Sequence, residues 1–402
     1  MDRTFNPHST SASGLSRRSA LKSAGAAAAS LAVPTGWAYA QGAPLKVGLM
    51  LPYSGTFAKL GENITAAVEM LIAEKGGKLG GRAVQIVKLD DESKPELAPQ
   101  NADRLVKRDG VDVLIGTVHS GVMMGIVKVV RDSGTLTIIP NAGNGAATGE
   151  LCAKNIFRTS FSNWQPAYGM GKALAAKAIK KAAWVSWDYA AGNEAGAGFK
   201  QGLEEGGGQL IKTLLLPFPE TNFQPLLAQI PGLGVEAVGA FYAGGGAVQF
   251  VKDYKAAGIK VPLCGSGFLT EGTLAAQGAA AEGIETALHY GDGLDNPKNT
   301  AFRAAFKEKT KGEADVYAVQ GYDAAQLLAA GLDAVKGDIK AEAELVKAME
   351  AAKIDSPRGP ISLSKSHNVV QNIYLRKVTS GQNKVIGIAA ANLADPGTGC
   401  KM

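Results

Sequence analysis

From Leu45 onward the sequence alternates short strand-like runs with longer amphipathic segments, and this alternation constrains the fold more than any other feature. The strand-like runs in the first part of the chain are 45–51, 84–89, 111–115 and 135–139. Between them, apolar residues recur with the spacing of one helix face, as in Ile64, Val68, Leu71 and Ile72. This pattern predicts parallel sheets that are covered by helices on both faces.

The alternation restarts after Asn163. The later strand-like runs are 182–187, 210–216, 237–242 and 261–264, and the helical segments beside them are 164–179, 194–205, 223–230 and 248–257. There are about four strand–helix units before Asn163 and four after it. Together they exceed what a single hydrophobic core of ordinary size can hold. We therefore expect an α/β protein with two sheets and hence two lobes.

The rest of the chain is expected to return to both lobes. Helices at 300–309 and 317–335 would join the first lobe, and strands at 372–378 and 384–390 would complete the second. Such a chain crosses between the lobes three times, near Phe161, Leu288 and Pro360, and these segments would be hinges. The predicted boundaries are 44–161 with 289–360 for the first lobe, and 162–288 with 361–395 for the second.

The first forty residues are typical of an export signal. Arg17 and Arg18 precede an alanine-rich stretch that ends in a small-x-small cleavage site at 38–40. The paired arginines resemble the signal of the bacterial pathway that exports folded proteins. A membrane anchor is the alternative, but residues 23–40 are mostly Ala, Gly and Ser and are interrupted by Pro34. We therefore predict cleavage before Gln41 and a mature chain that is not embedded in the membrane.

Composition excludes several functions. The formal net charge is +6, of which the signal segment supplies three, and the remaining lysines alternate with acids as in 307–309. No block of arginines interleaves with aromatic residues, so nucleic-acid binding is not expected. The four histidines lack metal-ligand spacing, and we predict neither a metal nor a cofactor.

Three cysteines follow the signal segment: Cys152, Cys264 and Cys400. An odd number in an oxidising compartment suggests one disulfide and one free thiol. Cys264 ends an apolar run, where cysteine behaves as a small hydrophobic residue. The preferred disulfide therefore joins Cys152 to Cys400 and ties the tail at 396–402 to the body. The alternative is that all three cysteines are reduced.

Six glycine-bearing loops follow predicted strands. They are 52–57, 116–121, 140–145, 187–192, 242–246 and 265–268. In open parallel sheets ligands bind beyond the carboxyl ends of the strands, where glycine allows close backbone approach and helix-end amides attract anions. Gly, Ser and Asn are also ordinary turn and cap residues, so any single loop is better explained structurally. Ser120 is a helix N-cap, a ligand donor, or both.

Enzyme motifs are weak in this sequence. Gly265 and Gly267 lack the third glycine of a dinucleotide fingerprint, and neither a P-loop nor a G-x-S-x-G elbow occurs. His119 beside Ser120 is not the usual arrangement of a base and a nucleophile. Asp90 and Asp91 are adjacent after a predicted strand, and a solvated turn explains this pair as well as acid–base chemistry does. We therefore predict no catalytic residues.

The segment 46–55, with the sequence Lys-Val-Gly-Leu-Met-Leu-Pro-Tyr-Ser-Gly, resembles the opening of the branched-chain amino-acid-binding proteins of bacterial ABC importers. Asp-Tyr-Ala-Ala-Gly at 188–192, Gly-Ser-Gly-Phe at 265–268 and Gly-Tyr-Asp-Ala-Ala at 321–325 extend the resemblance over the mature chain. The resemblance implies the type I periplasmic binding fold, with two Rossmann-like lobes joined by three hinge segments. It also implies a periplasmic monomer that traps a ligand and delivers it to a membrane permease rather than catalysing a reaction.

The resemblance assigns the ligand carboxylate to Ser120 and to the backbone of Asn141, Ala142 and Gly143. Amino-acid binders of this family place an acid in the loop that matches 265–268, where this sequence has none. Glu271 would take the place of this acid only if the loop follows a different path from that in the amino-acid binders. Because a buried ammonium without a partner costs several kcal/mol, an ordinary α-amino acid is not the expected ligand.

Within the family, the resemblance is closest to the branch that binds benzoate, hydroxybenzoates or hydroxycinnamates. Tyr189, Tyr242 and Phe268 would then stack on the ring, although one of these three is expected to be core packing. His119 and Ser120 would address a carboxylate or a phenol. The remaining expected contacts are Tyr53, Gly267 and the apolar wall residue Leu60. The alternatives are a branched-chain amino-acid or amide receptor, an exported sensory protein, and an exported α/β enzyme.

Overall fold

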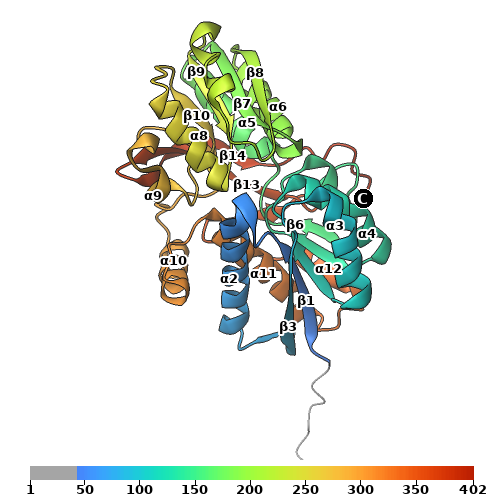
Figure 1. Cartoon of the computed structure of the whole chain (residues 1–402). Coiled ribbons are helices and arrows are strands. Elements are labelled where there is room, and N and C mark those ends of the chain that lie inside the picture. The colour runs from blue at the N-terminus through green and yellow to red at the C-terminus, as the bar shows by residue number, and fades with distance from the viewer. Residues whose placement is uncertain (1–42) are drawn as a thin grey trace, which may run out of the picture. The chain divides into compact units, whose positions relative to one another are not determined.

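The computed structural model describes residues 43–402, so the export signal expected at 1–40 lies outside the described residues. Within 43–402, strands and helices alternate around two sheets (Figure 1). None of the helices in this range is both long and apolar enough to cross a bilayer. The α/β architecture with two lobes that the sequence predicts is confirmed.

The first sheet has six strands in the order β2-β3-β1-β4-β5-β6, and all pairs except β2 with β3 are parallel. Its strands are β1 (Leu45–Leu51), β2 (Lys78–Leu79), β3 (Arg82–Asp90), β4 (Val113–Gly116), β5 (Leu136–Ile139) and β6 (Ile156–Arg158). The helices of this lobe are α2 (Ala58–Glu74), α3 (Ala98–Asp103), α4 (Ser120–Ser133), α10 (Pro297–Thr310), α11 (Val316–Ala334) and α12 (Glu342–Glu350).

Alternate side chains along β1 show how both faces of the first sheet are buried. Val47 and Leu49 belong to the same core as Ile64 of α2. Met50, on the opposite face, packs in a separate core with Ile126 of α4. Because helices cover both faces, the loops at the carboxyl ends of the strands gather at one edge of the sheet.

The second sheet has eight strands in the order β12-β13-β11-β10-β9-β7-β8, with β14 paired to β13. The strands are β7 (Lys181–Asp188), β8 (Gln209–Pro217), β9 (Ala237–Phe241), β10 (Leu263–Ser266), β11 (Glu285–Leu288), β12 (Ser362–Leu363), β13 (Val369–Thr379) and β14 (Gln382–Leu393). Pairs among β7 to β11 are parallel, and β13 is antiparallel to each of its neighbours. The helices of this lobe are α5 (Trp164–Ala176), α6 (Ala190–Glu204), α7 (Gln224–Leu227), α8 (Gly244–Ala256) and α9 (Leu274–Gln277).

A buried arginine holds together segments that pass between the sheets. Arg358, which is 2% exposed, forms an ion pair with Asp323 of α11 at 3.0 Å. Its Nη1 donates to the carbonyl oxygen of Ser160 at 2.9 Å and to Oε1 of Gln371 in β13 at 2.7 Å. Ser160 follows β6, so one guanidinium links the segment that leaves the first sheet to the strand that completes the second.

Two predicted helices differ from those observed, and proline explains one difference directly. The helix expected at 223–230 is reduced to α7, followed by a 3₁₀ turn at Ile230–Leu233. Pro231 lacks the amide hydrogen that a continuing α-helix requires. The strand–helix alternation also predicts a helix over 96–108, between the strand-like runs 84–89 and 111–115. In the structure this region is split into a 3₁₀ turn, α3 and a π-helical segment at Arg104–Arg108.

The cysteines lie as the sequence predicts. Cys152 and Cys400 form a disulfide with an S–S distance of 2.09 Å, and Cys264 is a free, buried thiol in β10. Burial raises the pKa of the Cys264 thiol to about 12, so this residue remains an uncharged part of the core.

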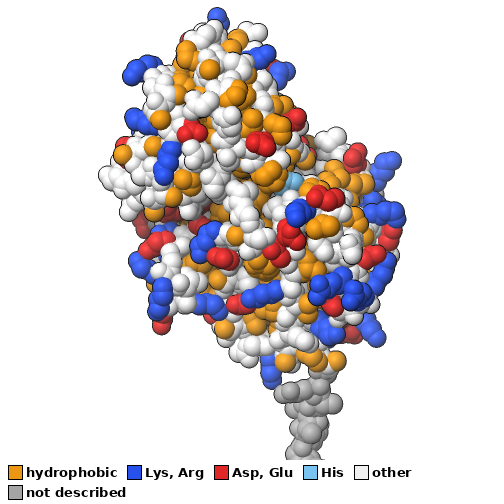
Figure 2. Space-filling view, in the orientation of Figure 1, with side chains coloured by type: hydrophobic (Ala, Val, Ile, Leu, Met, Phe, Trp, Pro, Cys, Tyr) orange, Lys and Arg blue, Asp and Glu red, His pale blue; other side chains and the backbone are white. Residues whose placement is uncertain are grey.

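Charges on the surface are mixed rather than segregated. Figure 2 shows Lys and Arg interspersed with Asp and Glu over the visible face. Several are paired one helical turn apart, such as Lys200 with Glu204 at 3.2 Å. Exposed pairs of this kind contribute at most about 1 kcal/mol each, and their pattern is that of an ordinary solvated surface.

Candidate functional site

A cavity of about 20 Å³ lies where loops of the two sheets meet. Fourteen residues line it: Phe57, Leu60, Val118, Ser120, Asn141, Gly143, Phe161, Asn163, Tyr189, Ala191, Phe241, Ala243, Phe268 and Tyr317. None of them carries a charge. We refer to this space as the central cavity.

One end of the central cavity is polar. Nδ2 of Asn163 donates to Oγ of Ser120 at 3.2 Å, and the backbone amide of Asn163 donates to the carbonyl oxygen of Gly143 at 2.7 Å. A Cβ on Gly143 would lie 2.4 Å from Oδ1 of Asn163, so only glycine fits there. Hydroxyl, amide and backbone groups are thereby held close together at this end.

The side chain of Asn141 is oriented by a buried chain of hydrogen bonds. Its Nδ2 donates to Oε1 of Gln320 in α11 at 2.7 Å, and Nε2 of Gln320 lies 3.0 Å from Nε2 of His289. Burial, and then the charges of Arg358 and Arg376, hold the pKa of His289 well below its usual value. His289 is therefore neutral, and Asn141 is positioned from behind by groups that do not reach the cavity.

The polar end favours an anion although no cation lines it. Ser120 is the first residue of α4, where the helix dipole gives positive potential. Behind the neighbouring loop lies Arg158, fully buried, whose Nη2 donates to the carbonyl oxygen of Asn144 at 2.8 Å. Burial lowers the pKa of Arg158 to about 10, so its guanidinium remains charged at neutral pH.

The other walls are aromatic. Phe161 and Phe268 have ring centroids 4.7 Å apart, and Phe268 lies edge-on to Phe241 at 6.0 Å. Tyr189 is 6.3 Å from Phe241 with nearly parallel rings. Such surfaces gain free energy from a flat apolar group placed among them.

His119 supports the site without lining it. Its Nδ1 accepts from the amides of Gly121 and Val122 at 3.1 and 3.3 Å, so His119 rather than Ser120 is the N-cap of α4. Its ring stacks on Tyr189 at 5.0 Å. Burial lowers the pKa of His119 to about 4, so the ring is neutral at pH 7 and does not offer a cation to a carboxylate.

Contacts across the cavity close the two lobes on each other. Oε2 of Glu194 in α6 accepts from the amide of Gly145 at 3.0 Å and from Nδ2 of Asn163 at 2.9 Å. Phe57 also packs against Phe218 with centroids 5.5 Å apart, and His119 packs against Phe218 at 4.8 Å. A ligand therefore enters or leaves only when these contacts separate.

Glu271 is not available to a ligand. Its Oε2 lies 2.6 Å from Nη1 of Arg376, and its Oε1 accepts from the amide of Val316 at 2.7 Å. Both charged side chains are almost fully buried, at 1% and 0% exposed. Glu271 therefore does not replace the acid that amino-acid binders use to pair with the ligand ammonium.

The structure brings together five of the ten expected contact residues and the expected wall residue Leu60. Those that line the central cavity are Ser120, Asn141, Gly143, Tyr189 and Phe268. His119 lies directly behind Tyr189, as described above. The proposed carboxylate end and the proposed ring wall therefore share one space.

The other four expected residues lie elsewhere. Tyr242 is fully buried in the second lobe, with its ring 5.0 Å from both Trp187 and Phe223, and so it is the one aromatic of the three that is core packing. The hydroxyl of Tyr53 is 2.8 Å from Oγ1 of Thr65. Ala142 and Gly267 are buried and do not line the cavity.

Eight lining residues were not expected: Phe57, Val118, Phe161, Asn163, Ala191, Phe241, Ala243 and Tyr317. Phe57, Val118, Ala191 and Ala243 fall inside loops that the sequence singled out, and Phe161 marks a predicted crossing. Tyr317 is the second residue of α11, more than a hundred residues from Asn163, and no local motif points to it.

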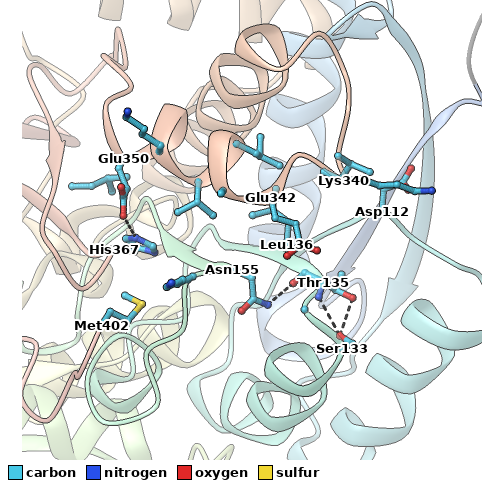
Figure 3. Close-up of a pocket in the computed structure, with 18 of the residues that line it drawn as sticks. Asp112, Ser133, Thr135, Leu136, Asn155, Lys340, Glu342, Glu350, His367 and Met402 are labelled. Atoms are coloured by element: carbon cyan, nitrogen blue, oxygen red, sulfur yellow. Dashed lines mark hydrogen bonds and ion pairs between the residues drawn. The ribbon is translucent and has the colours of Figure 1, made fainter.

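A second, larger space lies away from the central cavity. This open groove of about 1030 Å³ runs between α12 and the residues at 133–136 and 154–155 (Figure 3). Nε2 of His367 lies 2.9 Å from Oε1 of Glu350 at one end, and Asn155 donates to the carbonyl oxygen of Thr135 at 2.8 Å. Its rim mixes lysines with acids and it touches none of the strand-end loops, so the central cavity is the better candidate site. Among residues 43–402, no cluster of three or more potential metal ligands occurs.

Comparison with known proteins identifies relatives over almost the whole described chain. Residues 44–383 match the family model described as periplasmic binding protein. Leu/Ile/Val-binding protein homolog 6 of Brucella melitensis is 30% identical over 350 residues, which is 84% of this chain and 88% of that protein.

Two solved structures are also similar. One is a solute-binding protein of an ABC transporter from Rhodopseudomonas palustris in complex with benzoate, with 50% identity and a TM-score of 0.88 over 89% of this chain and all of that one. The other is an ABC-transporter solute-binding protein from Rhodopseudomonas palustris in complex with 3,4-dihydroxybenzoic acid. It has 30% identity and a TM-score of 0.83 over 88% of this chain and 99% of that one.

Proposed function

Because the chain belongs to the periplasmic binding protein family, we propose that it is the solute receptor of an ABC importer and that its ligand is an aromatic carboxylate. Benzoate and hydroxybenzoates are the first candidates, and hydroxycinnamates follow. The observation that carries the proposal is the central cavity itself, where an uncharged polar end adjoins aromatic walls.

The polar end accounts for the carboxylate. Ser120 supplies a hydroxyl whose oxygen accepts from Asn163, Asn141 supplies an amide, and Arg158 adds charge from behind. Preorganised donors of this kind bind an anion without an ion pair.

The walls account for the ring. Phe161, Phe241 and Phe268 provide faces and edges, and Tyr189 brings a fourth ring from the second lobe. Since the contacts come from both lobes, a bound ring stabilises the closed form over the open one.

A branched-chain amino acid is the second candidate, because the Brucella relative is named for leucine, isoleucine and valine. Against it stands the lack of an acid in the cavity wall and the engagement of Glu271 by Arg376. An α-ammonium in this cavity would be buried without a counter-charge, which costs several kcal/mol.

The remaining parts of the proposal follow from the family. The receptor acts as a monomer in the periplasm after export by the twin-arginine route, with lobes at 44–161 with 289–360 and at 162–288 with 361–395. Its closed form is recognised by a membrane permease. The ligand is released unchanged, so bound benzoate should be recovered intact after incubation.

Thermal unfolding with added ligand tests the proposal. Benzoate, 4-hydroxybenzoate, coumarate, leucine and valine are compared on the mature protein. A ligand at a thousand times its Kd adds about 4 kcal/mol, which raises the Tm by several degrees. A shift with leucine or valine alone contradicts the aromatic assignment.

Ser120→Ala tests the polar end. We expect it to weaken benzoate binding by roughly 1–3 kcal/mol, because a charged group loses a donor in a buried site. Ser133→Ala, at the exposed other end of α4, is the matched control and should bind as the wild type does. Equal affinity of all three proteins would remove Ser120 from the site.

A further inference from the structure

One hydroxyl in the wall of the central cavity has no hydrogen-bond partner. Tyr317 is 1% exposed, and its phenol oxygen contacts no donor or acceptor among residues 43–402. Of the fourteen lining residues, it is the one with such an orphaned side-chain group. Buried tyrosine hydroxyls normally have a partner, so this one requires an explanation.

The position of Tyr317 relative to the polar end is fixed by α11. Gln320, three residues further along the helix, bonds to Asn141 at the polar end. Residues three apart lie on the same helix face, and Tyr317 is therefore displaced by about 4.5 Å along the axis. The displacement is toward the second lobe, because the amide of Val316 in the same turn donates to Glu271 at 2.7 Å.

The surroundings of Tyr317 are aromatic rather than polar. Its ring lies 6.0 Å from that of Phe268, on the wall assigned above to the ring of the ligand. Burial and the nearby charges of Asp315 and Glu271 raise the pKa of this phenol well above its usual value. The group is therefore a neutral hydroxyl that both donates and accepts.

We propose that Tyr317 is a specificity-determining residue that reads a hydroxyl on the ligand ring at the end opposite the carboxylate. This inference rests on the function proposed above. With the carboxylate at Ser120, the ring would extend along the aromatic wall on which Tyr317 lies beside Phe268. The site thus selects 4-hydroxybenzoate and related para-hydroxylated acids over benzoate itself, because benzoate leaves the phenol of Tyr317 unpaired.

Calorimetric titration of three proteins with three ligands tests this inference. The proteins are the wild type, Tyr317→Phe and Tyr242→Phe, and the ligands are benzoate, 4-hydroxybenzoate and 2-hydroxybenzoate. Tyr242 is the matched control, because its hydroxyl is also buried without a partner among the described residues but does not line the cavity.

We expect the wild type and Tyr242→Phe to bind 4-hydroxybenzoate about tenfold or more tightly than benzoate. In Tyr317→Phe this preference should disappear, while benzoate binds at least as tightly as before. 2-Hydroxybenzoate carries its hydroxyl beside the carboxylate, and its affinity relative to benzoate should be the same in all three proteins.

Two results would overturn the inference while leaving the proposed function standing: a wild type without preference for the para-hydroxylated acid, or a preference that survives in Tyr317→Phe. The ratio of the wild-type Kd values for benzoate and 4-hydroxybenzoate tests the predicted preference even if Tyr317→Phe does not fold. If none of the aromatic acids binds to the wild type, the proposed function itself fails, and that outcome is distinct from the other two.

Discussion

The loops of the first sheet and those of the second contribute different chemistry to the central cavity. Ser120, Asn141 and Gly143, from the first, present a hydroxyl, an amide and a close-fitting backbone. Phe241 and Phe268, from the second, present rings. The groups suited to a charged end come from the first side, whereas rings come from both sides, because Phe57 of the first side also lines the cavity.

Gly143→Ala should have the largest effect, on the first side. Its added Cβ would lie 2.4 Å from Oδ1 of Asn163 and 2.8 Å from the ring of Phe161. Overpacking of this kind costs up to about 3 kcal/mol, which is about a hundredfold in Kd. Benzoate and 4-hydroxybenzoate should lose affinity equally, as measured by titration calorimetry.

Gly145→Ala is the control for that substitution. No atom lies within 4 Å of a Cβ at Gly145, and its backbone does not adopt a positive φ. It should bind both acids as the wild type does. Unchanged binding by Gly143→Ala would show that the carboxylate end has been misplaced.

Phe268→Leu addresses the second side. Leucine keeps apolar volume at this 3% exposed position but removes a ring whose contacts contribute about 0.5–1.5 kcal/mol. The affinity for benzoate should fall by up to about tenfold, while that for its saturated analogue cyclohexanecarboxylate should change little. An equal loss for both ligands would argue against a ring contact at Phe268.

Glu194→Gln tests the contact that joins the two sides. The carboxylate accepts from Gly145 and Asn163, and charge-assisted bonds exceed neutral ones by about 1 kcal/mol. Closure should weaken, and both acids should bind about fivefold less tightly. Glu204→Gln, in the last turn of the same helix, should leave the Kd unchanged, and a similar loss there would point to a general effect on α6.

His119→Asn should have the smallest effect, and on stability rather than binding. The pKa of His119 is depressed to about 4 in the folded protein, against 6.5 when unfolded, so protonation favours unfolding as the pH falls below 6.5. Asparagine is a good N-cap that does not titrate. Between pH 8 and pH 6 the wild type should lose about 0.8 kcal/mol relative to the variant, measured by urea unfolding. A constant difference would mean that His119 is accessible to protons in the folded state.

Much of the fold could be predicted because strand–helix alternation is a local signal. The strands near 45–51, 182–187 and 210–216 are present, whereas β6 and β11 were missed. β6 has the sequence Ile-Phe-Arg and β11 has Glu-Thr-Ala-Leu, so neither has the apolar run that marks the equally short β4 and β5.

The candidate site was only partly predictable. Phe241 and Tyr242 are adjacent at the end of β9, and successive side chains on a strand point in opposite directions, so only one of them can line the cavity. The sequence shows that the two aromatic residues lie at the end of a strand, but not which of the two side chains faces the cavity. Asn163 and Tyr317 reach the cavity from a crossing segment and from a distant helix, and only the tertiary structure brings them there.

The disulfide has a mechanical consequence. β14 ends at Leu393 in the second sheet, and Cys400 is bonded to Cys152, which lies between the last two strands of the first sheet. The tail is thus a fourth covalent strap between bodies that three chain segments already connect. The seven residues that follow Leu393, up to Cys400, span roughly 25 Å when fully extended, which is the upper limit on the distance between Leu393 and Cys400. The tail therefore allows the two lobes to move apart but limits how far they can separate.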